Sequence, residues 1–571
     1  MRVVALSALA LAALALPASA AAAPVRELTF TVPVSEPGEA GEPVTIATDV
    51  YLPKRRSPRR GLPLIMLFHG GGSTKDNEFD ADRARWFARR GYVTLLYTAR
   101  GHNGSGGQTT VAGPREIRDL FDVAAWALRR RGTVPRHPDF RIDRRRIGLW
   151  GISQGGLHTN LGEAYSRDRE LNPYRIRFRA IAPGNTPDRV FEALVDRGAV
   201  KLSYGAGLLA TYGPHNAKVS PTLEKWIASA AADDPSLYGG AVCDAAGHDT
   251  PTSSMKADLA ARSVGCMLAR VRAPALWTQA FDDGLFPPEM AIRAWRRLPR
   301  RSDDRLILWM AGHGAPAALE SVHRRAFRAQ LAFLNHALRG RPLRLPRVLY
   351  WTRDPRVAVP SDSYAYEPKA WLARRSPRWP PPRTRPMVLR LGADGLARPR
   401  GAEAGTLALA PLSADTAFDP VAKAALSATP VGTSPLPAQL AAPGSPGLVA
   451  SFQAAAVRRT EELSGTPRAT VSWTPAGPDS QLALKLFDRA PDGTLTLLSR
   501  GIAGLRGRTP GQPLRVALHG NATSALIRPG HSLLAWITAS DLFYYKPYPG
   551  QAGGTLEVGP AATLTVPLRR P

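Results

Sequence analysis

The sequence Arg146-Ile-Gly-Leu-Trp-Gly-Ile-Ser-Gln-Gly-Gly156 decides the fold of this chain. Its apolar residues Ile147 to Trp150 predict a buried strand, and helix-compatible residues follow the last glycines. Ser153 occupies the turn between the two elements. Such a sharp turn pushes the hydroxyl away from the backbone and leaves room only for glycine at the flanking positions. The stretch therefore predicts a nucleophile elbow, although the same pattern also arises by chance, so that its surroundings must decide.

Apolar runs on both sides of this turn predict further strands of one sheet. They are Leu62 to Phe68, Gly91 to Tyr97, Phe178 to Pro183, Pro274 to Gln279 and Arg305 to Met310. Helical patterns at Asp80 to Arg90, Arg115 to Arg131 and Ser321 to Leu338 separate several of them. Strands that alternate with helices predict an α/β fold with a mostly parallel, doubly wound sheet. Glu27 to Val34 and Val44 to Leu52 alternate in polarity, which predicts antiparallel edge strands.

At 571 residues the chain is too long for a single core. We expect an α/β domain over residues 24–342, in which residues 184–272 are too long for a simple connection and form a mainly helical cap over the active site. Residues 343–386 form a connecting segment, dense in Pro and Arg from about residue 361 on, where we expect it to wrap the surface. Short alternating strands with Gly/Pro turns predict an all-β sandwich over residues 387–571.

The start of the chain resembles an export signal. A basic residue, an apolar run to Leu16 and small residues to Ala20 predict a signal peptide within residues 1–23, the alternative being an uncleaved anchor. We see no later apolar run of about 18 residues, so we expect a secreted protein without stable membrane insertion. Cys243 and Cys266 fit one disulfide in an exported protein; the alternative is two unpaired buried thiols. Their surroundings do not have metal-ligand spacing, so we expect no metal.

The formal net charge of +29 does not point to nucleic acid. The excess is mostly arginine scattered through loops, with neither an aromatic-studded basic stripe nor a recognisable nucleic-acid module. We expect a solvated basic surface that is weakly attracted to anionic envelopes or polymers.

A catalytic serine needs a base, and the base needs an orienting acid. Two loops after the elbow offer them in the order Ser, Asp, His that α/β-hydrolases use. Ala280-Phe-Asp-Asp-Gly-Leu-Phe-Pro287 follows one strand, and Ala311-Gly-His-Gly314 follows the next. These loops predict a triad of Ser153, Asp283 and His313, with no cofactor. Asp282 is the alternative acid, although it better fits a turn-capping role.

The other histidines and the oxyanion site complete the prediction. His323 and His336 fall in the following helix, where we expect surface or packing residues, and His158 falls on the elbow helix, where we expect a satisfied structural role. The oxyanion of acyl transfer needs preorganised donors. We expect the backbone N–H of Gln154 and that of Gly71, in His69-Gly-Gly-Gly72, to supply them; the alternative is that these glycines only form a tight turn.

With these residues in place, the chain resembles the X-Pro dipeptidyl-peptidase and cocaine esterase family of α/β-hydrolases. The resemblance lies in Thr48 to Pro53, Thr98 to Gly106, Gln279 to Pro287, Asn335 to Gly340, Pro529 to Ser532, and Ser540-Asp541. It implies a helical cap, a C-terminal non-catalytic jelly-roll domain, hydrolysis of amides or esters, and a triad at the three positions named. The chain departs from many members in having Gln154 after the nucleophile and glycines where several place an oxyanion-binding tyrosine.

The resemblance also sets the expected substrate, a peptide with proline second from its amino terminus. A short acyl ester is the alternative, and an inactive envelope-binding protein is a second one. A dipeptidyl-peptidase must hold a free amine with carboxylates. Glu163, Asp188 and Glu192 are the candidates, although we expect them to be ordinary solvated acids. The sequence does not predict an oligomeric state.

Overall fold

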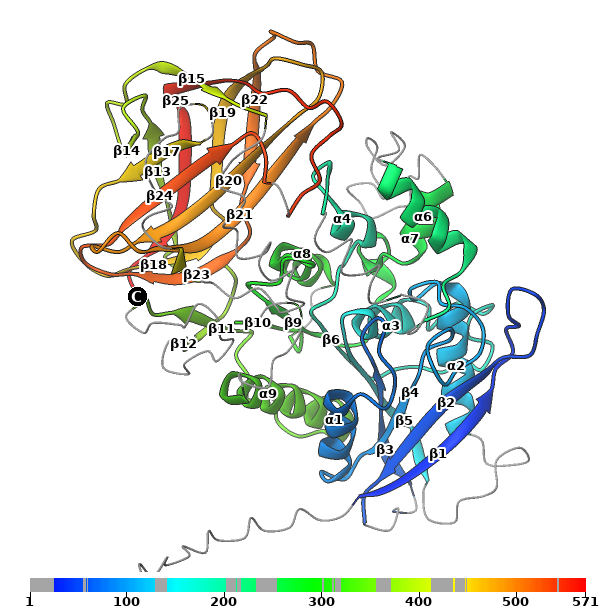
Figure 1. Cartoon of the computed structure of the whole chain (residues 1–571). Coiled ribbons are helices and arrows are strands. Elements are labelled where there is room, and N and C mark those ends of the chain that lie inside the picture. Colours follow the sequence, from blue (N-terminus) through cyan, green and yellow to red (C-terminus); the bar gives the residue numbers. More distant parts are fainter. Residues whose placement is uncertain are drawn as a thin grey trace, which may run out of the picture.

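A computed structural model of the chain describes most of its residues. They are 25–54, 58, 60–128, 141–201, 212, 217–232, 254–299, 302–310, 313, 320–355, 371–411, 435–436, 447, 449–541 and 544–571. The expected signal peptide and Cys243 lie outside this set, so both stay predictions. Cys266, the other half of the expected disulfide, is buried. The chain forms an α/β part and a β-rich part, each built around an apolar core of its own (Figure 1).

The sheet of the α/β part is mostly parallel, which confirms the predicted doubly wound architecture. In spatial order its strands are β1 (Arg26–Pro33), β2 (Thr45–Leu52), β4 (Val93–Tyr97), β3 (Leu62–Phe68), β5 (Ile142–Ile152), β6 (Ala180–Gly184), β9 (Leu276–Ala280) and β10 (Arg305–Trp309). Only the pairs β1–β2 and β2–β4 among them are antiparallel. Strands β4, β6 and β9 are buried along their whole length, because helices cover both faces.

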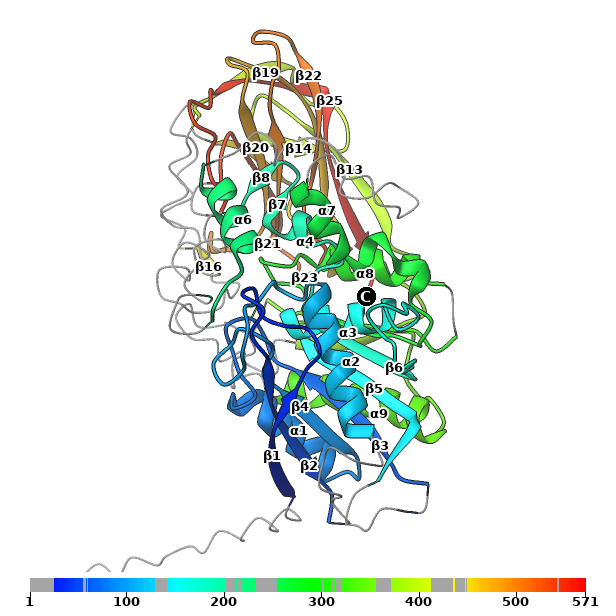
Figure 2. The same ribbon diagram turned by 90° about the vertical axis from the view of Figure 1, so that its right-hand side faces the viewer.

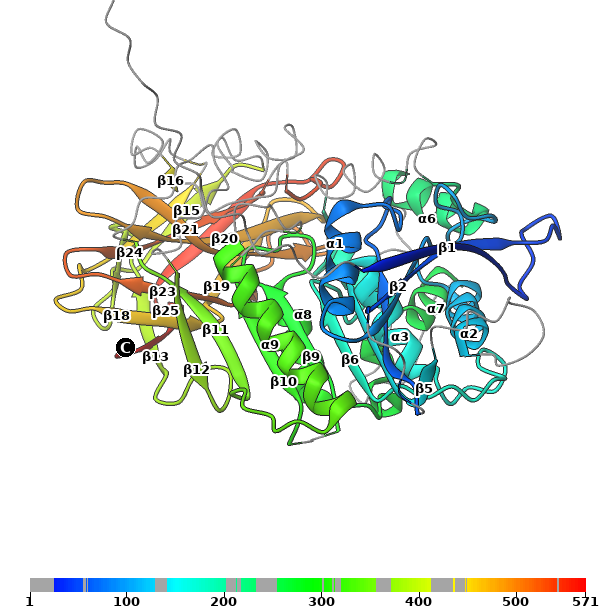
Figure 3. The same ribbon diagram turned by 90° about the horizontal axis from the view of Figure 1, so that it is seen from below.

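Helices pack on both faces of this sheet (Figure 3). On one face lie α1 (Glu78–Ala88) and α9 (Glu320–Arg339), which meet through the rings of Phe79 and Phe327, 6.1 Å apart. On the other lie α2 (Pro114–Leu128) and α3 (Gln154–Ala164). Helix α8 (Pro288–Arg297) packs on β9 and β10. Because the strands from β4 to β10 are parallel, their carboxyl ends lie at one edge of the sheet, where the site is built.

The segment between β6 and β9 is less uniformly helical than expected. Its described elements are α4 (Val190–Leu194), β7 (Val195–Asp196), β8 (Ala199–Val200), α6 (Pro221–Ala232), α7 (Ser254–Ala261), η2 (Val264–Cys266) and η3 (Leu268–Arg270). Strands β7 and β8 form a small antiparallel hairpin. Figure 1 shows α6 and α7 above α2 and α3, to the side of the β-rich part, with α4 nearer to the β-rich part. Figure 2 shows the same three helices from the right-hand side of that view.

The connecting segment of residues 343–386 contributes two strands to the main sheet, while the expectation that its Pro- and Arg-rich part from about residue 361 on wraps the surface stays a prediction. Strand β11 (Val348–Arg353) lies parallel to β10, and β12 (Trp371–Ser376) lies antiparallel to β11, so both extend the sheet. Every residue of β11 is buried. The prolines and arginines around these short runs hid two strands of the main sheet.

The C-terminal part consists of strands, as predicted. They are β13 (Arg385–Leu391), β14 (Leu396–Arg398), β15 (Gly405–Leu409), β16 (Pro435–Leu436), β17 (Ala450–Ala454), β18 (Glu461–Gly465), β19 (Arg468–Pro475), β20 (Ser480–Arg489), β21 (Leu495–Leu505), β22 (Leu514–His519), β23 (Thr523–Ile527), β24 (Ser532–Thr538) and β25 (Gly554–Arg569). Alternate residues of β19 and much of β25 point into the shared core. The jelly-roll connectivity and the domain limits stay predictions.

Candidate active site

Ser153 sits in a strained turn at the end of β5. Its φ of 59° and ψ of −124° lie in a region that residues with a side chain rarely occupy, and α3 begins at the next residue. A Cβ on Gly151 would collide with the backbone of Gly155, and one on Gly155 would collide with the Phe68 carbonyl. The close packing of backbone around the turn explains both glycines and leaves the serine hydroxyl at the carboxyl edge of the sheet.

The three predicted triad residues meet at this edge. Ser153 Oγ lies 3.0 Å from His313 Nε2. On the other side of the ring, His313 Nδ1 lies 3.0 Å from Asp283 Oδ2 and 3.2 Å from Oδ1. Asp283 follows β9 and His313 follows β10, so neighbouring strands bring together residues that are remote along the chain. The arrangement allows an imidazole to take the serine proton while a buried carboxylate orients it.

The loop after β9 holds the Asp283 carboxylate in place. Phe286 N–H donates to Asp283 Oδ1 at 2.8 Å, and Gln279 Nε2 donates to Oδ2 at 3.1 Å. The Phe286 ring lies edge-on to the His313 ring, with centroids 4.8 Å apart. One short loop, Asp283 to Phe286, therefore positions both the carboxylate and the imidazole.

The alternative acid, Asp282, has a different environment. Its Oδ2 is buried and has no hydrogen-bond partner within the described part of the chain. Burial raises the pKa of its carboxyl to about 7, although the positive charge of Arg353 acts in the opposite direction. A group in this state contributes nothing to orienting His313, so the geometry favours Asp283.

This raised pKa predicts a pH-dependent gain in stability for Asp282→Asn. The folded-state pKa lies above the ordinary aspartate value, so stability falls as the pH rises from about 4 through 7. A neutral asparagine avoids that loss. We expect the variant to match the wild type at pH 4 and to be about 1–3 kcal/mol more stable at pH 8, measured by chemical denaturation. A variant less stable than the wild type at pH 8 would contradict the assignment.

Two backbone N–H groups near Ser153 are available for an oxyanion. Gln154 is the first residue of α3, where a helix does not use the N–H group. Gly71 lies in the loop after β3, and its N–H makes no hydrogen bond to another described residue. Gly72 N–H is taken by His102 Nε2 at 3.3 Å. A Cβ on Gly70 would lie 3.8 Å from Ser153 Cβ, so this loop runs beside the serine.

Two buried histidines hold the glycine loop, a role the sequence did not reveal. His69 Nδ1 lies 2.6 Å from the Gly70 carbonyl, and its Nε2 accepts from Ala99 N–H at 2.8 Å. These partners assign the proton to Nδ1. Burial lowers the pKa of His69 to about 3 and also lowers that of His102, so both rings are neutral at pH 7. The neutral His102 ring accepts from the Gly72 N–H, and the neutral His69 ring donates to the Gly70 carbonyl.

The side chain of Gln154 is held from two sides. Tyr212, from the inserted segment, donates its hydroxyl to Gln154 Oε1 at 2.7 Å, and Gln154 Nε2 lies 3.3 Å from Glu116 Oε2. His158 is buried with polar partners on both ring nitrogens, in line with a structural role: its Nε2 lies 3.1 Å from Glu116 Oε2, and its Nδ1 lies 3.0 Å from the Gln154 carbonyl. A Cβ on Gly71 would collide with the Tyr212 hydroxyl. Tyr212 therefore packs against both residues predicted to bind the oxyanion.

The expectation that the three candidate amine-binding acids are solvated is wrong for Glu163 and Asp188. Glu163 is buried and accepts from the N–H groups of Arg272 and Ala273, each at 2.9 Å. Asp188 is buried and forms a two-bond ion pair with Arg293 at 2.7 and 2.6 Å. Arg293 also reaches Glu192 at 2.7 Å. All three carboxylates are already engaged, so their placement does not present a ready site for a substrate amine.

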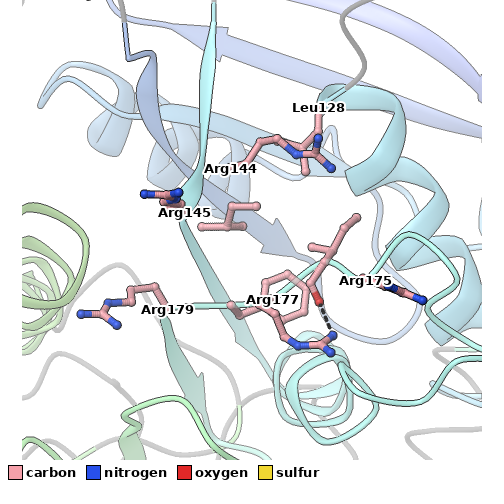
Figure 4. Close-up of a pocket in the computed structure, with 9 residues that line it drawn as sticks. Leu128, Arg144, Arg145, Arg175, Arg177 and Arg179 are labelled. Atoms are coloured by element: carbon pink, nitrogen blue, oxygen red, sulfur yellow. Dashed lines mark hydrogen bonds between the residues drawn. The ribbon is translucent and has the colours of Figure 1, made fainter.

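A hollow of about 530 Å³ lies at the other end of the sheet (Figure 4). Its lining combines five arginines with an apolar floor: Arg144, Arg145, Arg175, Arg177, Arg179, Leu128, Ile147, Ile176 and Phe178. It adjoins the amino ends of β5 and β6, whereas Ser153 follows the carboxyl end of β5. Ser153 lies six positions after Ile147 along the chain, a rise of roughly 20 Å in a strand. The hollow is therefore not the acyl-binding pocket of the triad.

Two features bear on other functions. Among the described helices, none combines the length and the apolar character that crossing a bilayer requires. In the same part of the chain, we find no group of three or more His, Cys, Asp or Glu side chains that could hold a metal ion.

Comparison with known proteins agrees with this architecture. Residues 41–315 match the family model of X-Pro dipeptidyl-peptidase (S15 family), and residues 343–565 match that of the X-Pro dipeptidyl-peptidase C-terminal non-catalytic domain. Dipeptidyl aminopeptidase BIII of Pseudoxanthomonas mexicana is 30% identical over 112 residues. That alignment spans only 19% of this chain and 15% of the relative.

Solved structures share the fold over nearly the whole chain. An alpha-amino acid ester hydrolase superposes with a TM-score of 0.69 at 16% identity, covering 97% of this chain and 98% of the other. A CocE/NonD family hydrolase from Staphylococcus aureus gives 0.65 at 13% identity, covering 95% and 94%. An aminopeptidase from a marine sediment thaumarchaeote gives 0.65 at 15% identity, covering 95% and 96%. At these identities the likeness concerns the fold alone.

Proposed function

The chain belongs to the X-Pro dipeptidyl-peptidase and cocaine esterase-like family of α/β-hydrolases, and from this premise we propose that it is a secreted serine hydrolase working through an acyl-enzyme. The observation that carries the proposal is the hydrogen-bonded chain from Ser153 through His313 to Asp283, with separations of 3.0 Å at each link. The signal-like start of the chain supports export.

The proposed reaction has two acyl-transfer steps. His313 Nε2 takes the proton as Ser153 Oγ attacks the substrate carbonyl carbon, and the N–H groups of Gln154 and Gly71 bind the oxyanion that forms. His313 then gives this proton to the leaving amine or alcohol, and the carbonyl re-forms as the acyl-enzyme. Water attacks the acyl-enzyme with His313 as base. The returning proton restores Ser153 and releases a carboxylic acid.

The substrate we propose first is a peptide with proline second from its amino terminus. Its support is the family, together with the partial match to a dipeptidyl aminopeptidase. A second candidate is a short acyl ester. The engagement of Glu163, Asp188 and Glu192 favours it, because an ester hydrolase needs no carboxylate for a substrate amine.

Two measurements test the proposal. A fluorophosphonate probe should label the wild-type protein covalently, since its phosphorus reacts with an activated serine. Hydrolysis of Gly-Pro p-nitroanilide, compared with p-nitrophenyl butyrate by kcat/KM, separates the two substrate classes. A preference for the anilide supports the dipeptidyl-peptidase, and a preference for the ester supports the second candidate. If the wild-type protein is not labelled by the probe and hydrolyses neither substrate, the result favours an inactive, envelope-binding protein and refutes the proposal.

A further inference from the structure

The β-rich part reaches the loop that carries the triad acid. Tyr544 is buried, and its hydroxyl donates to the Gly284 carbonyl at 2.5 Å. Gly284 directly follows Asp283 in the loop that positions both Asp283 and His313. The Tyr544 ring lies 4.5 Å from the Arg500 guanidinium and 4.6 Å from the Tyr545 ring. The hydroxyl is therefore held in place by neighbours within its own part of the molecule.

Lys201, which follows β8 in the inserted segment, contacts the same loop. Its buried Nζ donates to the carbonyls of Gly284 and Leu285, at 3.0 and 2.8 Å. Burial lowers the pKa of Lys201 to about 8, although the negative charges of Asp196 and Asp283 act in the opposite direction. The ammonium therefore remains charged at neutral pH. The Gly284 carbonyl thus accepts from two donors of different origin, the inserted segment and the β-rich part.

The two donors are tied to each other through the backbone. Lys546 N–H donates to the Val200 carbonyl at 2.7 Å, and Lys201 and Tyr545 form an antiparallel bridge. The inserted segment and the residues after Tyr544 therefore contact the acid loop as one unit.

We infer that Tyr544 and Lys201 are positioning residues for the triad, so that the C-terminal domain takes part in catalysis by fixing the loop Asp283 to Phe286. The inference rests on the proposed function, because it concerns that same site. Removing a donor frees the loop to shift, which misaligns the carboxylate and the imidazole together. Substrate-binding groups elsewhere are left in place. The predicted signature is a lower kcat with an unchanged KM.

The chain contains matched controls for this test. Tyr545 donates its hydroxyl to Asp196 Oδ2 at 2.8 Å, and Tyr548 donates to the Gly198 carbonyl at 2.6 Å. Both are buried tyrosines of the same segment and bond across the same interface. Neither of these bonds reaches the acid loop. A Tyr→Phe change removes a hydroxyl that donates to a backbone carbonyl at positions 544 and 548, and one that donates to a carboxylate at position 545.

The experiment measures kcat, KM, the rate of fluorophosphonate labelling and thermal unfolding of the full-length variants. We expect Tyr544→Phe to lower kcat and the labelling rate about fivefold to twentyfold, with KM within about twofold. Tyr548→Phe should stay within about twofold of the wild type in both rates, whereas Tyr545→Phe is compared for thermal stability only, because its ring packs on Tyr544 and its backbone bridges to Lys201. All three should lose similar thermal stability. Lys201→Met removes two hydrogen bonds to the loop, so it should lower kcat at least as much as Tyr544→Phe.

Two results would overturn the inference, and they differ from each other. If the wild type is active but Tyr544→Phe and Lys201→Met both match Tyr548→Phe in kcat, the loop does not depend on these donors and the proposed function stands. If the wild type is neither labelled nor active, the proposed function fails and the inference fails with it.

Discussion

Ser153→Ala is expected to abolish fluorophosphonate labelling and to lower kcat/KM by at least about 10⁴-fold. The serine oxygen is the atom that forms the acyl bond in the proposed mechanism, and alanine offers no replacement. The hydroxyl lies 3.0 Å from His313 Nε2. The positive φ at residue 153 strains the backbone of an alanine as much as that of a serine, because both residues carry a Cβ. The variant should therefore fold like the wild type, which thermal unfolding checks.

Ser166→Ala is a suitable control for this variant. Ser166 is a buried serine shortly after α3, and it lies outside the triad. Its replacement should leave labelling unchanged. If Ser153→Ala is still labelled at the wild-type rate, another serine is the nucleophile and the triad assignment is wrong.

The sequence predicted the sheet and the order of the triad because both depend on local patterns. Apolar runs of strand length mark buried strands, and residues that follow consecutive parallel strands must share an edge. The strand β11 escaped notice for a local reason as well. Its buried run, Val348 to Arg353, is short, contains a threonine and ends in arginine, and Pro and Arg dominate its surroundings.

The groups that support the site could not be predicted, because their partners are distant along the chain. Glu116 and Asp119 recur at helical spacing in α2, a pattern typical of a solvated face. Both are buried, Asp119 against Arg100 at 2.7 Å and Glu116 near His158. Tyr544 reaches Gly284 across 260 residues. No periodicity or motif marks such contacts, although a buried acid in α2 could have been suspected from the histidine on the elbow helix.

Asp283→Asn is the second variant with a large expected effect, about 10⁴-fold in kcat. Asp283 Oδ1 accepts from Phe286 N–H and Oδ2 accepts from Gln279 Nε2. An asparagine amide keeps only one oxygen, so its NH₂ group must replace Oδ1 or Oδ2, which lie 3.2 and 3.0 Å from His313 Nδ1 and each accept from one of these two donors. When the NH₂ group donates to Nδ1, the ring carries its proton on Nε2, facing Ser153 Oγ, and cannot take the serine proton.

Asp282→Asn is the matched control, because it makes the same substitution one residue earlier. Its carboxyl is not hydrogen-bonded to His313 in the described structure. Because the pKa of Asp282 is raised to about 7, its carboxyl is already partly protonated near neutral pH, and an uncharged asparagine resembles this protonated form. We expect its kcat to stay within about twofold of the wild type, measured on the substrate that the comparison of anilide and ester selects. If Asp282→Asn lost activity and Asp283→Asn kept more than a tenth of it, the orienting acid would be Asp282. Both variants replace one carboxyl group with an amide in the same loop, so a difference between them reports which of the two side chains orients His313.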